Sequence, residues 1–214
     1  MSDIPLHDDI QVETQPLNAS IATALFLPML YALAYWGSGW VTGDADAIAL
    51  ALPLEDHIPL LPWMIIPYLS LNVVFLLSAF LCETRRELAL MVTRLLLVLA
   101  VALVVFILYP TTTSFSNSHV EGLLAGVFDW LNRIDVRNNA FPSLHVAMAV
   151  VLWPHLRRGA TPPARPLVHT WLAFVVASTV LTHRHHVLDA VAGAALGLVA
   201  VALVRRREAA AKVI

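Results

Sequence analysis

Lysine and arginine are absent from the first 84 positions of this chain, and charge of either sign is scarce throughout. Of the 214 residues, 13% are charged and 59% are hydrophobic. This composition is far from that of a soluble globular domain, and the mean hydropathy of +0.75 indicates an integral membrane protein. The net charge of -2 provides no basic face that could neutralise a phosphate backbone, so nucleic acid is not expected as a partner.

Cysteine is nearly absent as well. Cys82 is the only one, which excludes an intrachain disulfide. It lies in an apolar run, where a lone thiol usually packs as a small hydrophobic side chain. Residues 1–20 are acidic and polar without a basic stretch, so we expect a short tail there and not a secretory signal.

Long apolar runs are what the chain has in abundance. Because a helix needs roughly 20 apolar residues to cross a bilayer, we predict an all-α membrane bundle of six transmembrane helices. The predicted spans are residues 21–41, 58–81, 88–109, 141–156, 167–182 and 187–204. Three prolines, Pro59, Pro62 and Pro67, should make the second span irregular. The six-helix domain then covers residues 21–204, between an acidic tail (1–20) and a basic tail (205–214).

The basic residues indicate which way the helices run, because Lys and Arg are retained on the cytoplasmic side. Most of them follow the second, fourth and sixth predicted spans: Arg85, Arg86, Arg157, Arg158, Arg165, Arg205, Arg206, Arg207 and Lys212. The opposite loops hold three arginines among seven acidic residues. Both termini are therefore expected in the cytoplasm. With no sorting signal, a bacterial inner membrane with the opposite loops facing the periplasm fits best.

The loop of residues 110–140 is the only long one. Its segment 121–134 carries apolar side chains on roughly one helical face, which is typical of a helix lying along the membrane interface. Two interpretations stay open for this segment: a lid that packs over the bundle, or an element that contacts substrate.

Two polar stretches, residues 141–145 and 183–189, lie at the predicted non-cytoplasmic face, and we expect them to carry the chemistry. His185 and Asp189 are four residues apart, so on a helix that begins near residue 185 they share a face, and the carboxylate can orient the imidazole. The other ring nitrogen is then free to attack phosphorus. His145, at the start of the fourth span, could protonate the leaving alkoxide. The hydroxyl of Ser143 and the helix N-terminus suit an oxyanion.

These stretches also resemble a known family. Residues 141–145 (Phe-Pro-Ser-Leu-His) look like the Pro-Ser-Gly-His element of the type 2 phosphatidic acid phosphatase superfamily, and Ser178 through His185 to Asp189 looks like its third motif. The resemblance spans most of the chain from the third span onward and implies six transmembrane helices. It also implies that His145 is the general acid, that His185 becomes phosphorylated and that Asp189 orients it.

All three family motifs are altered in this chain. Leu144 replaces the usual Gly, Thr179 stands where the third motif has Arg, and Ala102 occupies the Lys position of a first motif reduced to Tyr109-Pro110. These departures are similar to the branch that contains sphingomyelin synthases and inositol phosphorylceramide synthases, whose members transfer head groups.

The scarcity of cations near these motifs also favours head-group transfer, because its phosphodiester substrate, a monoanion, demands less positive charge than a phosphomonoester dianion. Arg184 and Arg137 are the candidate phosphate ligands, and Arg133 is a third possibility. His186 is the alternative nucleophile. Gly193 and Gly197 continue the face of Asp189 and predict close packing of another helix.

The sequence thus predicts an enzyme that cleaves a membrane lipid phosphoester through a phosphohistidine, with no metal or cofactor. A head-group transferase or phospholipase-C-like enzyme, in which a lipid hydroxyl can be the acceptor, is preferred over a lipid phosphate or polyprenyl diphosphate phosphatase. A different class also stays open, in which several of these side chains bind a metal in a metalloenzyme or transporter. Its candidate ligands are His145, His183, His185, His186 and Asp189.

Overall fold

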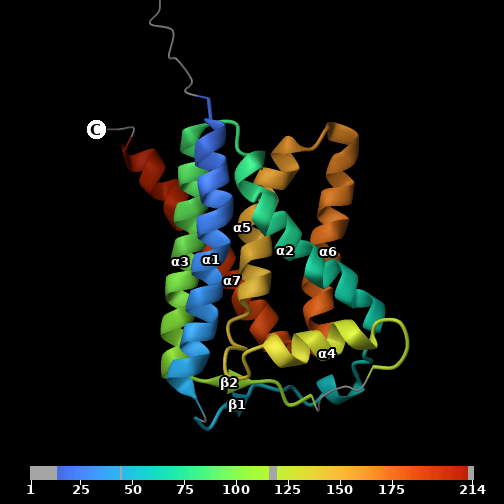
Figure 1. The fold of residues 1–214 in the computed structure, drawn as a ribbon. Helices are drawn as coiled ribbons and strands as arrows, with labels where there is room; N and C mark the ends of the chain where they lie inside the picture. Colours follow the sequence, from blue (N-terminus) through green and yellow to red (C-terminus); the bar gives the residue numbers. More distant parts are fainter. Residues whose placement is uncertain (1–13, 44, 116–119, 212–214) are drawn as a thin grey trace, which may run out of the picture.

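The computed structural model describes residues 14–43, 45–115 and 120–211, so most of the predicted acidic tail lies outside the described residues. The described part is a bundle of α-helices closed at one end by a layer of loops (Figure 1). In chain order the elements are α1 (Leu17–Thr42), β1 (Ile48–Ala49), η1 (Glu55–His57), η2 (Pro62–Met64), α2 (Ile65–Leu77), η3 (Ser78–Leu81), α3 (Arg85–Leu108), β2 (Thr111–Thr112), α4 (Ala125–Ile134), α5 (Leu144–Gly159), η4 (Pro162–Ala164), α6 (Arg165–Leu181) and α7 (Val187–Ala211).

Helix α5 lies at the centre of the bundle and packs against α3, α6 and α7 (Figure 1). Every residue from Leu144 to Leu152 is buried, including the small side chains of Ala147 and Ala149. Because protein and not lipid surrounds it, α5 needs neither the length nor the apolar surface of a lipid-facing helix. It has 16 residues.

Five helical stretches of the described chain are long and apolar enough to cross a membrane. They are Leu17–Thr42, Pro62–Leu81, Arg85–Leu108, Pro162–Leu181 and Val187–Arg207. Each coincides with a predicted span. The remaining prediction, residues 141–156, corresponds to the short central helix α5, so the structure supports five of the six predicted spans and does not confirm the sixth.

The boundaries of the predicted spans shift at several places. The start of the second span is irregular as its prolines predicted, because the 3-10 turn η2 precedes helix α2. A second 3-10 turn, η3, follows α2 where the span contains no proline. Helix α1 begins at Leu17, inside the stretch predicted as a tail. Helix α7 continues to Ala211, so the predicted basic tail from residue 205 is largely helical.

The two ends of the bundle carry different elements. The first turn of α1 and the last turns of α7 lie at the end that also carries the arginines at the start of α3 (Figure 1). At the opposite end α4 runs across the bundle beside β1 and β2. Helix α4 falls within the predicted segment 121–134, and it buries Phe128 and Leu131 against Ile65 and Val120.

Helices α5 and α7 approach each other closely at their N-terminal ends. The Ser143 N–H, at the N-cap of α5, donates to the main-chain carbonyl of Asp189 at 3.0 Å. A Cβ atom on Gly193 would lie 2.3 Å from the Ser143 carbonyl oxygen, and one on Gly197 would lie 2.8 Å from that of Ala147. The interpretation of both glycines as packing positions is therefore confirmed.

Replacing Gly193 with alanine should force the ends of α5 and α7 apart. The added methyl group meets backbone, which cannot rotate away, so we expect a loss of about 1–3 kcal/mol of stability, as for other overpacked cores. Gly37→Ala is the matched control, since nothing lies within 4 Å of its Cβ position. Thermal unfolding in detergent measures both variants. Equal melting temperatures for the two would contradict the backbone contact.

Candidate active site

Two of the three predicted catalytic side chains, His145 and His185, line one cavity, and the third, Asp189, lies beside His185 without lining it. The cavity has a volume of about 670 Å³. His145, Arg184 and His185 are part of its wall, together with residues of α1, α2 and α4. The two polar stretches, which are separated in the chain by most of α5 and by α6, therefore meet in space as their sidedness predicted.

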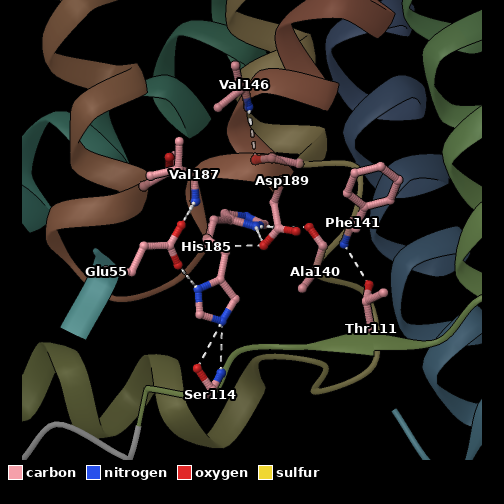
Figure 2. Close-up of polar contacts among 12 residues, drawn as sticks. Glu55, Thr111, Ser114, Ala140, Phe141, Val146, His185, Val187 and Asp189 are labelled. Carbon is pink, nitrogen blue, oxygen red and sulfur yellow. Dashed lines mark hydrogen bonds and ion pairs between the residues drawn. The ribbon is translucent and has the colours of Figure 1, made fainter. Parts of the chain in front are cut away.

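His185 is held through its Nδ1 atom. That atom lies 3.0 Å from the Ala140 carbonyl oxygen and 3.7 Å from Asp189 Oδ2 (Figure 2). Both neighbours can only accept, so Nδ1 carries the proton and Nε2 keeps its lone pair. The sequence predicted a hydrogen bond from the imidazole to Asp189, whereas the structure places that bond at Ala140, with the carboxylate just beyond hydrogen-bond reach. The resulting tautomer is the one that a nucleophilic Nε2 requires.

Asp189 is almost completely buried, with 1% of its surface exposed. Its Oδ2 atom accepts the N–H of His186 at 2.8 Å, while Oδ1 has no hydrogen-bond partner among the described residues. Helix α7 begins at Val187, so His185 precedes the helix instead of sharing its face as predicted. A buried carboxylate beside the ring stabilises positive charge when Nε2 forms a bond.

Strand β2 fixes the carbonyl group that holds His185. The Ala140 N–H donates to the Thr111 carbonyl at 3.0 Å, and the Phe141 N–H donates to Thr111 Oγ1 at 2.8 Å (Figure 2). Thr111 also pairs with Ile48 of β1. The loop before α5 is thus tied to the loops that follow α1 and α3.

His145 lies in the first turn of α5 and contacts α2. Its Nε2 donates to the Tyr68 carbonyl at 2.7 Å, since a carbonyl oxygen can only accept. The imidazole also stacks on the Tyr68 ring, with the centroids 4.1 Å apart and the planes at 4°. Nδ1 is therefore the atom through which His145 can exchange a proton with a bound molecule.

Ser143 has a different place from the one expected of a substrate ligand. Its side chain is fully buried, and Oγ accepts the Val146 N–H at 3.3 Å as the N-cap of α5. Ser143 is not among the residues that line the cavity. Its hydroxyl satisfies the helix end, as N-cap residues commonly do.

Arg184 is the cation best placed to meet an anion in the cavity. Only 10% of its side chain is exposed, and its Nη1 lies 3.5 Å from Asp135 Oδ2. The guanidinium carbon lies 5.5 Å from the centre of the Phe128 ring, and Nε has no hydrogen-bond partner among the described residues. Arg137 lines the same cavity but is exposed, and Arg133 is not part of the wall.

The other two histidines of the second polar stretch are bonded to the surrounding loops. His183 Nε2 lies 3.0 Å from the Ile58 carbonyl. His186 is fully buried, with Nδ1 against Glu55 Oε2 and Nε2 accepting the Ser114 N–H at 3.0 Å. Both ring nitrogens of His186 are thus in use, which removes it as an alternative nucleophile. Within the described residues, no group of three or more His, Cys, Asp or Glu side chains is arranged to hold a metal ion.

Glu55 is the site residue that sequence reasoning missed. It lies in the loop between α1 and α2, next to Asp56 in a short acidic stretch that is typical of solvated surface. No spacing links it to His186, 131 residues away in the chain. A glutamate in a loop between apolar spans offered no pattern that would distinguish it from its neighbours.

The positions that depart from the family motifs have structural roles of their own. The Thr179 carbonyl accepts the N–H groups of both Arg184 and His185, each at 3.0 Å. Ala102, at the position of the first-motif lysine, is completely buried in the core next to other α3 residues. The main chain at position 179, whichever side chain it carries, therefore shapes the turn that holds Arg184 and His185.

Comparison with known proteins gives one match. A family model described as the PAP2 superfamily matches residues 46–203, which is most of the chain and includes every cavity residue discussed above except those on α1. No curated protein and no solved structure matches the chain.

Proposed function

The chain belongs to the PAP2 superfamily, and from this premise we propose that it is a membrane enzyme that breaks a lipid phosphoester through a phosphohistidine at His185. The observation that carries the proposal is the state of that imidazole. Nδ1 is bonded to the Ala140 carbonyl beside the buried Asp189 carboxylate, so Nε2 has a free lone pair at the wall of a cavity. A histidine oriented in this way is a competent nucleophile.

The proposed reaction has two steps. In the first, His185 Nε2 attacks phosphorus and the bond from phosphorus to the leaving oxygen breaks, while His145, protonated on both ring nitrogens, gives its Nδ1 proton to that oxygen and keeps its Nε2 proton on the Tyr68 carbonyl. Asp189 offsets the positive charge that develops on the His185 ring. In the second, water or a lipid hydroxyl attacks phosphorus, its proton passes to His145, and the bond to Nε2 breaks.

The shape of the cavity supports a lipid substrate. Its wall combines polar residues such as Arg184 and His185 with apolar residues of the bundle such as Pro28, Phe75 and Met148. A molecule that fills both parts needs a charged head and an apolar tail. That the cavity lies in a bundle of helices apolar enough to cross a membrane also supports a lipid substrate.

We place the site at the non-cytoplasmic face. With α5 counted as a sixth crossing, the arginine-rich ends of α3, α5 and α7 lie in the cytoplasm together with both termini, as the retention of basic residues favours. The cavity and α4 then lie at the opposite interface, which is the periplasmic side if the membrane is a bacterial inner membrane. In this arrangement α4 contacts substrate, because Phe128, Leu131 and Asn132 line the cavity.

Within this reaction we favour a phosphodiester substrate, and hence head-group transfer or phospholipase-C-like cleavage. Arg184, the less exposed of the two arginines in the described cavity wall, forms an ion pair with Asp135, which also accepts a hydrogen bond from the Tyr35 hydroxyl. A phosphodiester carries one negative charge and matches this weak field, whereas a monoester dianion needs more cations. A lipid phosphate or polyprenyl diphosphate phosphatase is the alternative.

His185→Ala, His145→Ala and Asp189→Asn should each lose turnover while the protein stays folded. Each variant removes the nucleophile, the acid or the carboxylate beside the nucleophile, while the rest of the cavity can still bind substrate. We therefore expect a decrease in kcat of about a thousandfold or more. The amide oxygen in the Asp189→Asn variant can still accept the His186 N–H, which preserves the fold. His169→Ala is the control, because that exposed histidine lies outside the cavity. Turnover that persists in the three variants would refute the mechanism.

Arg184→Ala should weaken binding of the phosphate group. Loss of charge-assisted hydrogen bonds of about 1.5–3 kcal/mol corresponds to a 10- to 100-fold increase in KM or decrease in kcat/KM. Arg133→Ala is the matched control, since it removes an exposed arginine of α4 that does not line the cavity. Steady-state kinetics with a lipid substrate compare the two. Equal effects would point to a general surface charge and not to a phosphate ligand.

The products distinguish the proposed subclass from its alternative. Purified enzyme is incubated with phosphatidic acid, polyprenyl diphosphate and a phospholipid, with and without ceramide as acceptor, and the products are resolved by mass. A phosphodiester enzyme releases a phosphorylated head group or forms a new phospholipid. Free inorganic phosphate from the first two substrates alone would instead identify a phosphatase.

A further inference from the structure

Glu55 is buried, although it belongs to the short 3-10 turn η1 in the connection between α1 and α2. Only 2% of its surface is exposed, whereas Asp56 beside it is exposed. Burying a carboxylate is costly unless its oxygen atoms find donors. Glu55 reaches from the α1–α2 loop to the start of α7, and both of its oxygen atoms are used there (Figure 2).

The donors and acceptors around Glu55 allow one arrangement. A backbone N–H can only donate, so the Ser114 N–H makes His186 Nε2 an acceptor and leaves the proton of the neutral ring on Nδ1. That proton goes to Glu55 Oε2, and the Val187 N–H goes to Oε1 at 2.8 Å. Two donors require two acceptors, which a carboxylate provides. A glutamine at this position would offer one acceptor and one donor.

Glu55 and His186 are linked to the proposed nucleophile, His185, through the main chain of His186. The His186 N–H donates to Asp189 Oδ2 at 2.8 Å, and His186 directly follows His185 in the chain. The carboxylates of Glu55 and Asp189 thus take up N–H groups at the N-terminal end of α7, where negative charge is favourable. Neither Glu55 nor His186 lines the cavity.

We infer that Glu55 and His186 form a second histidine–carboxylate pair that positions His185 and Asp189 for the reaction without touching the substrate. The inference rests on the proposed function of the site. Together with Ser114, the pair joins three loops that are distant in the chain, and it fixes the turn in which His185 presents Nε2. Glu55 and His186 are positioning residues, and His185 is the nucleophile.

Glu55→Gln tests this pair, because it keeps the shape of the side chain and removes one acceptor. We expect kcat to decrease about 10- to 100-fold, the equivalent of one lost hydrogen bond to a charged group, with KM within about twofold of the wild type. Asp56→Asn is the matched control and should leave both constants unchanged. A Glu55→Gln variant with wild-type kcat would overturn the inference.

Variants of His186 separate positioning from catalysis. Glutamine carries a donor and an acceptor, as neutral imidazole does, so His186→Gln should be at least about tenfold more active than His186→Ala. His185→Gln has no nucleophile and should be inactive. If His186→Gln is as inactive as His185→Gln, His186 takes part in the chemistry and the positioning role is refuted.

A labelling experiment tests the pair independently of turnover. Diethyl pyrocarbonate modifies unprotonated histidine nitrogens that it can reach, and peptide mass mapping locates the label. His186 should resist modification in the wild type and in Asp56→Asn, and become modified in Glu55→Gln. Unchanged protection in Glu55→Gln would overturn the inference. A wild-type enzyme that cleaves none of the lipids tested would refute the proposed function and leave this readout intact.

Discussion

The backbone contact between the N-terminal ends of α5 and α7 is the constraint on which the rest of this structure depends. The Ser143 N–H donates to the Asp189 carbonyl, and Gly193 leaves room for the Ser143 carbonyl at a distance that no side chain would tolerate. Two helix starts from distant parts of the chain are thereby held together, so His145 and His185 face one cavity. Side-chain packing alone would keep the helices further apart.

A layer of loops satisfies the polar groups that this contact concentrates at one end of an apolar bundle. Thr111 fixes the Ala140 carbonyl that holds His185, while Glu55 and Ser114 occupy both nitrogens of His186. Each loop enters from a different part of the chain. Because unpaired polar groups are costly away from water, these loops stabilise the site and also fix the tautomer of the histidine that reacts.

The residues that carry the proposed chemistry could be predicted from the sequence, because they lie in short contiguous patterns. His185, Asp189 and His145 all belong to motifs of a few residues, and the sidedness of the basic residues predicted that the motifs meet. Ser143 and Glu55 could not be assigned in this way. A hydroxyl at a helix start can face a ligand or cap the helix, and the two choices differ only in the direction of the side chain. The partner of Glu55 lies 131 residues away.

The sequence by itself determined the apolar helices, the irregular second span and the small residues at which α7 meets a neighbour, since these follow from local composition and spacing. Only the tertiary structure decided that α5 is a short buried helix, that the Asp189 carboxylate lies beside the His185 ring without a hydrogen bond to it, and that Arg184 forms an ion pair with Asp135. The physical reason is the distance along the chain over which each effect acts. Hydrophobicity and helix periodicity act within one segment, whereas the partner of a buried polar group is chosen by whichever distant donor or acceptor the packed helices bring within about 3 Å.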